Sequence, residues 1–164
     1  ELAAADPLEV EFRIPLRAIT LDSLTVTAEQ QRMNLATTGF YTRREREQGV
    51  FMDREQIEKR RAVRTMDLLR AIPGVRLVAT GGYSGTGPTQ QLQMRGFGGG
   101  QGPCVPRIFI DGMQIAGADT DLDDIVFPHH IEAVEVYRGS AQVPVAYGGA
   151  SGACGVILIW TRRS

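Results

Sequence analysis

The chain has 164 residues, enough for one domain with a packed core and an appended segment. Apolar residues make up 43% and charged residues 23%, as in an ordinary globular protein. The formal net charge of −1 argues against nucleic-acid binding as the main role, because that role requires a basic surface. No apolar run approaches the roughly 20 residues of a membrane-spanning helix.

The N-terminal part is predicted to be an arm, residues 1–38, ahead of a domain over residues 39–164. Residues 8–17 alternate between apolar and polar, which predicts a half-buried strand. Its apolar face consists of Leu8, Val10, Phe12, Ile14 and Leu16. A second strand-like segment follows at residues 21–28, and the polar residues 29–38 are interpreted as a flexible link. The chain begins at Glu1 without a methionine, which favours a processed or excerpted chain.

Helices are predicted in the first part of the domain. Residues 39–48 favour a short charged helix that Gly49 stops. Asp53 is a good N-cap, with Gln56 in the capping-box position, for a helix to about residue 61. Thr65 is predicted to cap a further helix over residues 66–72, which Pro73 and Gly74 end.

Short strands and glycine-rich loops are predicted next. Strands are expected at residues 75–78, 92–95, 107–110 and 113–115, with loops at 80–89 and 96–103. Asp111 and Gly112 form a favoured hairpin turn between the last two strands. Residues 121–127 favour a short helix that Pro128 ends.

The core is predicted in residues 131–161. A short alternating strand over residues 131–136 is followed by a small-residue segment, 146–152. Residues 156–160 are apolar on both faces, which is typical of a buried central strand. Earlier segments are expected to pack against this strand.

No enzyme or metal motif keeps its critical positions. Residues 119–124 begin like a calcium loop, but Asp124 and His130 stand where glycine and glutamate are needed. The adjacent His129 and His130 lack a third ligand. The glycine loops lack the dinucleotide and phosphate-loop spacings, and no serine fits G-x-S-x-G. We therefore predict no catalytic residue, no metal site, no cofactor and no enzymatic activity.

Two cysteines, Cys104 and Cys154, lie 50 residues apart, each beside a predicted strand. A disulfide between them would close a long loop and stabilise the fold by about 4 kcal/mol. It would also imply an oxidising, extracytoplasmic compartment. The alternatives are two buried thiols or a metal pair that lacks partners. The disulfide is the favoured interpretation.

Six segments, in matching order over residues 50–162, resemble the plug domain of TonB-dependent outer-membrane receptors. They are 66–75 (MDLLRAIPGV), 92–97 (LQMRGF), 108–112 (IFIDG), 131–139 (IEAVEVYRG), Tyr147-Gly148 and 155–162. The resemblance implies an α+β fold: a small mixed sheet with short helices and glycine-rich apical loops. It also implies an extracytoplasmic location, in the periplasm, outer membrane or cell surface of a Gram-negative-type bacterium.

A segment of the arm also resembles the TonB box of that family. It consists of Asp22, Ser23, Leu24, Thr25, Val26, Thr27 and Ala28. In the family this segment joins the periplasmic energy-transducing protein as an added strand. An ordinary strand or linker is the alternative. Residues 8–17 resemble the final strand of the carboxypeptidase-regulatory-like domains that often precede such plugs.

Two functions are consistent with these features. Only three residues follow Thr161, so no barrel is expected on this chain. The first function is a non-enzymatic interaction or assembly module, whose arm adds to another copy and builds open chains or filaments. The second is the gating and ligand-binding plug of a nutrient receptor whose barrel is absent from this chain. The expected partners are other copies, a TonB-like periplasmic protein or a separate barrel.

Overall fold

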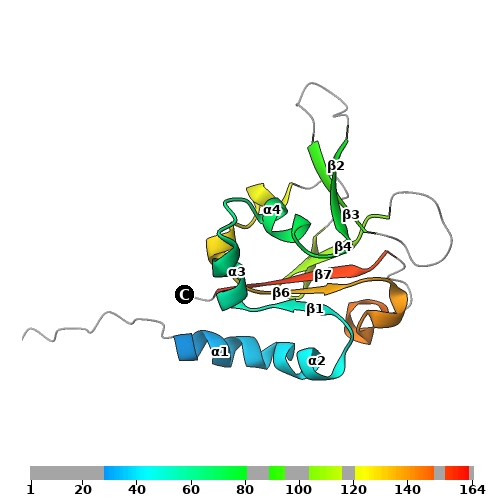
Figure 1. Cartoon of the computed structure of the whole chain (residues 1–164). Helices are drawn as coiled ribbons and strands as arrows, with labels where there is room; N and C mark the ends of the chain where they lie inside the picture. Colours follow the sequence, from blue (N-terminus) through cyan, green and yellow to red (C-terminus); the bar gives the residue numbers. More distant parts are fainter. Residues whose placement is uncertain (1–27, 81–88, 95–103, 116–120, 150–153, 163–164) are drawn as a thin grey trace, which may run out of the picture.

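The computed structural model describes residues 28–80, 89–94, 104–115, 121–149 and 154–162 (Figure 1). The predicted arm strand, residues 8–17, lies outside the described residues. The same holds for residues 22–27 of the TonB-box-like segment and for most of both predicted glycine-rich loops.

A five-stranded mixed sheet forms the centre of the fold, with the strand order β1-β6-β7-β4-β5. The strands are β1 (Val50–Met52), β4 (Arg107–Ile110), β5 (Met113–Ile115), β6 (Ile131–Tyr137) and β7 (Val156–Thr161). β4 runs parallel to β7, and the other neighbours are antiparallel. β7 is the middle strand and is buried from Val156 to Trp160, which confirms the predicted central strand.

Both faces of the sheet are covered, and this explains the burial of β6. The sequence predicted an alternating strand, but every residue of β6 is buried, including Glu132 and Glu135. On one face lie α3 (Arg54–Arg60), α4 (Thr65–Arg70) and the 3-10 turn η1 (Leu122–Asp124). On the other face lie α1 (Ala28–Thr37) and α2 (Phe40–Arg46), as Figure 1 shows below the sheet.

Each face carries its own apolar cluster. The cluster under α3 and α4 includes Met52, Ile57, Leu68, Leu69, Leu122 and Ile159. The cluster under α1 and α2 includes Leu35, Phe40, Phe109, Tyr137, Leu158 and Trp160. A separate antiparallel pair, β2 (Val75–Thr80) and β3 (Thr89–Met94), projects from the sheet in Figure 1. Three further 3-10 turns are η2 (Pro128–His130), η3 (Ser140–Gln142) and η4 (Val145–Tyr147).

Two of the predicted helices begin and end close to the expected residues. α2 occupies residues 40–46 after Gly39, whose φ of 78° is in the left-handed region. At α3, Asp53 accepts from the backbone N–H of Gln56, and the Gln56 side chain accepts from the backbone N–H of Asp53. This reciprocal pair confirms the predicted capping box.

The start of α4 corrects one prediction. Thr65 is the first helical residue and not the cap, which is Arg64, and the helix ends at Arg70 and not at residue 72. The Thr65 hydroxyl donates to the carbonyl of Val126. Asp123 supplies the acceptor for the backbone N–H of Met66, at 3.1 Å. The side chain that satisfies this helix start therefore comes from a distant segment.

The expected flexible link over residues 29–38 is also wrong, since α1 occupies residues 28–37. Two residues of this polar helix, Gln31 and Leu35, are buried against the fold, so the apolar periodicity that would have predicted it is weak. The helix predicted at 121–127 is instead the turn η1, and Pro128 begins η2 where it was expected to end a helix. β3 starts at Thr89, three residues earlier than predicted.

Candidate functional site

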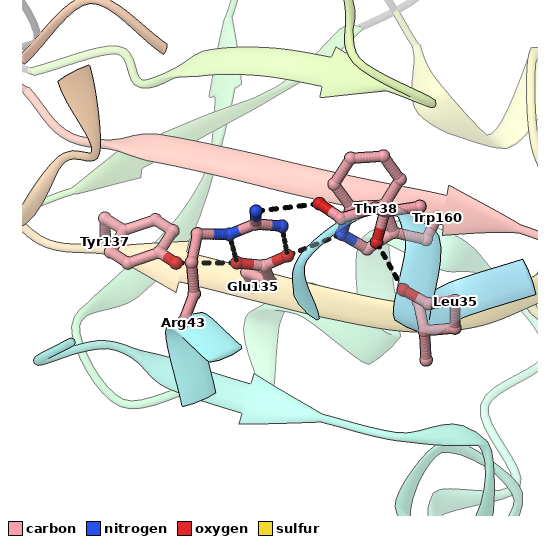
Figure 2. A network of polar contacts seen from close by, with 6 residues as sticks. All are labelled: Leu35, Thr38, Arg43, Glu135, Tyr137 and Trp160. Carbon is pink, nitrogen blue, oxygen red and sulfur yellow. Dashed lines mark hydrogen bonds and ion pairs between the residues drawn. The ribbon is translucent and has the colours of Figure 1, made fainter. Parts of the chain in front are cut away.

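Glu135, in the middle of β6, is the most deeply enclosed charged group among the described residues, with 0% of its surface exposed. Its carboxylate accepts four hydrogen bonds, shown in Figure 2. The donors are Tyr137 Oη at 2.6 Å, Trp160 Nε1 at 2.6 Å, Arg43 Nε at 2.9 Å and Arg43 Nη2 at 2.6 Å. A buried carboxylate is stable only when its oxygens are satisfied in this way.

The strand geometry brings these groups together. Glu135 and Tyr137 are two residues apart on β6 and therefore lie on the same face. Trp160 is on that face of the neighbouring strand β7. Arg43 comes from α2, and its Nη1 also donates to the backbone carbonyl of Thr38, at 2.8 Å, between α1 and α2 (Figure 2). One guanidinium thus joins the helical layer to the two central strands.

The electrostatics of this cluster favour a fixed ion pair. Burial alone would lower the pKa of Arg43, but the hydrogen bond and charge of Glu135 outweigh it, so the pKa is raised. Burial, followed by the hydrogen bond to Glu135, raises the pKa of Tyr137 well above its usual range. Neither group changes protonation near neutral pH. The cluster therefore suits mechanical attachment better than acid–base chemistry.

Two aromatic rings flank the Arg43 guanidinium. Its central carbon lies 5.7 Å from the ring centre of Tyr147 and 5.6 Å from that of Trp160. Such cation–π contacts add to the attraction of the carboxylate and limit the approach of water. Glu135 and Arg43 are functional candidates that the sequence did not predict. The available signal was a glutamate between two valines in the predicted strand at residues 131–136.

The structure describes some of the site residues that the sequence predicted. Cys104 and Cys154 form a disulfide in the structure, with Cα atoms 5.1 Å apart, between the segments that precede β4 and β7. Ala28, the last residue of the TonB-box-like segment, is the first residue of α1. The rings of His129 and His130 are 4.0 Å apart. Within the described ranges, no group of three or more His, Cys, Asp and Glu residues is arranged to hold a metal ion.

Two motif residues have structural roles in the sheet. Asp111, at a φ of 49°, accepts hydrogen bonds from the backbone N–H and the hydroxyl of Thr161, which fixes the β4–β5 turn against the end of β7. A Cβ at Gly155 would lie 2.2 Å from the carbonyl oxygen of Tyr137, so only glycine allows β7 to start there.

The mixed sheet, the short helices on both of its faces and the buried ion pair that joins it to α2 make this an α+β domain. The chain belongs to the TonB-dependent Receptor Plug Domain family, whose model matches residues 44–154. α1 and the first part of α2, with Arg43, precede the matched residues. Membership places the chain outside the cytoplasm of a Gram-negative bacterium, as the sequence predicted.

Similar solved structures are receptors for siderophores and for ferric enterobactin. The siderophore receptor PirA from Acinetobacter baumannii is 26% identical, with 70% of this chain and 17% of that chain covered and a TM-score of 0.51. The ferric enterobactin receptor PfeA from Pseudomonas aeruginosa, as a variant in complex with enterobactin, is 25% identical, with 71% and 18% covered and a TM-score of 0.52. This chain therefore spans less than a fifth of these receptors.

A second PfeA variant is 24% identical, with 76% of this chain and 19% of that chain covered and a TM-score of 0.53, which supports the fold alone. Comparison with curated proteins gave no match. In the part of the chain that the structure describes, no helix has the length and apolar character needed to cross a membrane.

Proposed function

We propose that this chain is the gating plug of a TonB-dependent nutrient receptor and that α1 and α2 link its TonB-box-like segment to the sheet. The observation that carries the proposal is the Arg43–Glu135 ion pair. The TonB-box-like segment runs into α1 at Ala28, α1 leads directly to α2, and α2 is tied to β6. The family of the chain and its likeness to siderophore receptors support the same role.

The link has a simple mechanical consequence. When a partner adds a strand along residues 22–27, force applied there reaches α1 first. The charge-assisted hydrogen bonds of Arg43 are among the strongest side-chain contacts between α2 and the sheet. Displacement of the arm is therefore passed to β6 and β7. A plug that moves in this way gates a passage and performs no chemistry on its cargo.

The test is binding of the periplasmic domain of TonB from the same bacterium to the 164-residue chain. Val26→Pro removes a backbone donor from the segment expected to pair, whereas Val26→Thr keeps the N–H and the branched shape. We expect the wild type and Val26→Thr to bind alike and Val26→Pro to bind up to about tenfold more weakly, because one backbone hydrogen bond is lost. Equal binding of all three, or none by the wild type, contradicts the proposal.

Assembly by strand donation is the second candidate. Among the described strands, β1 and β5 are the edges of the five-stranded sheet, and Met113 on β5 is 74% exposed. Such an edge accepts an added strand, and the apolar face of residues 8–17 is a suitable donor. The candidate rests on these edges and on the arm sequence, and deletion of residues 1–20 tests it.

A further inference from the structure

Arg107, the first residue of β4, presents a second guanidinium on the sheet face that carries Phe109 and Tyr147. Its Nε and Nη2 atoms are buried, and the described residues offer them no hydrogen-bond acceptor. Buried donors without a partner cost about 1–3 kcal/mol, more for a charged group. Arg107 therefore needs a hydrogen-bond acceptor that the described residues do not supply.

The position of the guanidinium is fixed by Gly148. A Cβ on Gly148 would lie 2.3 Å from Nη2 and 2.5 Å from Nη1 of Arg107, so the guanidinium rests against the backbone of this residue. Gly148 has a φ of 100°, which a residue with a side chain rarely adopts. Both the backbone conformation and the space require glycine here. The backbone of Gly148, just after η4, therefore packs directly against the Arg107 head group.

Arg43 shows what the Nε and Nη2 edge of a guanidinium can bind. Its Nε and Nη2 hold the two oxygens of Glu135, at 2.9 and 2.6 Å. Arg107 presents the same two atoms, also buried and on the same face, without an acceptor in the described part of the chain. A planar carboxylate fits this pair of parallel donors bidentately.

The neighbouring sequence does not provide that carboxylate. Residues 95–103 (RGFGGGQGP) precede Cys104, and residues 150–153 (ASGA) precede Cys154; neither stretch contains Asp or Glu. The disulfide joins Cys104 and Cys154, the residues that follow these two stretches in sequence. Glu135, a carboxylate on the same sheet face, is already held by Arg43. The acceptor therefore comes either from a bound solute or from an acid of residues 1–27 or 116–120, which the structure does not describe.

We propose that Arg107 binds a carboxylate group of a small-molecule ligand, with Gly148 as the floor of the site. The inference rests on the proposed gating function where it concerns transport. It then names carboxylate-bearing solutes as the substrate class of the receptor. Carboxylate binding itself is a property of the isolated chain and is measured without TonB.

The test uses the 164-residue chain labelled with ¹⁵N-arginine and follows the Nε–H signals by NMR. Acetate, succinate and citrate are titrated at constant ionic strength, with chloride and inorganic phosphate as comparison anions. We expect a saturable shift of the Arg107 signal with the carboxylates and a smaller, non-saturating response to the other two. Binding to Arg107→Lys is followed by the Nε–H signals of the other arginines. This variant should bind about tenfold more weakly, because a lysine cannot form the bidentate pair. Arg60→Lys, at an exposed arginine of α3, should bind like the wild type.

Three results would overturn the inference. The first is no saturable shift with any carboxylate, or equal binding by Arg107→Lys. The second is equal or tighter binding of phosphate, which would make the site one for anions in general. The third is an Arg107 signal that has its bound chemical shift without ligand and moves to the free shift when residues 1–27 are deleted. The acceptor is then an acid of the arm. Failure here leaves TonB binding by the Val26 variants unaffected, so the two proposals fail separately.

Discussion

Arg43 and Glu135 lie 92 residues apart in sequence and form the charged contact between the helical layer α1–α2 and the sheet. The guanidinium donates through Nε and Nη2, and the carboxylate is completely buried. Because a buried charge is strongly unfavourable without its partner, the position of α2 is set by this pair as well as by apolar packing. The attachment of α1–α2 should therefore depend on Arg43.

Arg43→Met tests this dependence. Methionine keeps much of the length and removes the charge, which leaves Glu135 buried without a cation. We expect the free energy of unfolding to fall by about 3–5 kcal/mol, measured by urea denaturation. The matched control is Arg44→Met, whose partner Asp53 is partly exposed. Loss of that surface ion pair should change stability by at most about 1 kcal/mol.

A double variant separates the ion pair from general packing. Adding Glu135→Gln to Arg43→Met removes the unpaired charge and should recover a large part of the lost stability. The two changes should therefore be strongly non-additive. Additive losses would show that Arg43 acts through packing alone and would contradict the role assigned to the pair.

Local signals explain which elements the sequence predicted. Asp53 and Gln56 define the start of α3 within four residues, and Asp111 with Gly112 defines the β4–β5 hairpin. The run in β7 is apolar on both faces, so its central position in the sheet could be predicted without knowing which strands pair with it. Each of these patterns is complete in a short stretch of chain.

The missed elements depend on distant contacts. α1 buries only a few residues, among them Leu35, and its amphipathic pattern is too weak to predict a helix. Thr65 was interpreted as a cap because the acceptor for the α4 N-terminus, Asp123, is 57 residues away. The four donors around Glu135 come together only through strand register and helix packing. A single sequence does not specify such a convergence.

Glu132 predicts a pH dependence of stability that differs from the usual behaviour of a carboxylate. It is 7% exposed, its Oε2 lacks a hydrogen-bond partner among the described residues, and Arg162 Nε is 3.6 Å from that atom. Burial raises its pKa, with Glu58 acting in the same direction and Arg162, Arg54 and Arg32 opposing it. The folded state therefore binds more protons than the unfolded state between the two pKa values. Its contribution to stability is present below about pH 4.3 and is lost as pH rises through the folded pKa.

Glu132→Gln tests this sign. The variant cannot ionise, so it should be more stable than the wild type by roughly 1 kcal/mol at pH 7 and should lose that advantage at pH 4. Urea denaturation at both pH values measures the difference. Glu58→Gln, at an exposed residue paired with Arg54, should show little change at either pH. The same difference at pH 4 and pH 7 would exclude burial of the charge as its cause.

The disulfide predicts a redox-dependent stability. It closes a loop of 50 residues between Cys104 and Cys154, so the double change Cys104→Ser with Cys154→Ser should lower the free energy of unfolding by about 4 kcal/mol. Wild-type chain treated with a reductant should approach the stability of this variant. Non-reducing peptide mapping of the mature protein should recover the two cysteines as one linked pair. Recovery of both as free thiols would also remove an argument for an oxidising compartment.

Deletion of residues 1–20 tests the assembly role of the arm. Five apolar residues on one face of residues 8–17 are too many to leave in water, and burying that face contributes several kcal/mol at about 25 cal/mol per Å². Donation to an edge strand of a neighbouring copy is head-to-tail and does not close, so it would build open chains. The full chain should then assemble as its concentration rises, and the deletion variant should be a folded monomer by light scattering and circular dichroism.

A pair of point variants and a hydrogen-exchange measurement decide how the result of that deletion is interpreted. Leu16→Asp in the full chain places a charge on the donor face and should also give a monomer, whereas Arg17→Asp on the opposite face should leave assembly intact. Hydrogen exchange shows where the arm is bound. A full chain that stays monomeric at high concentration with residues 8–17 protected has its strand packed within its own fold. In that case strand donation is excluded, and the gating role is the one that remains.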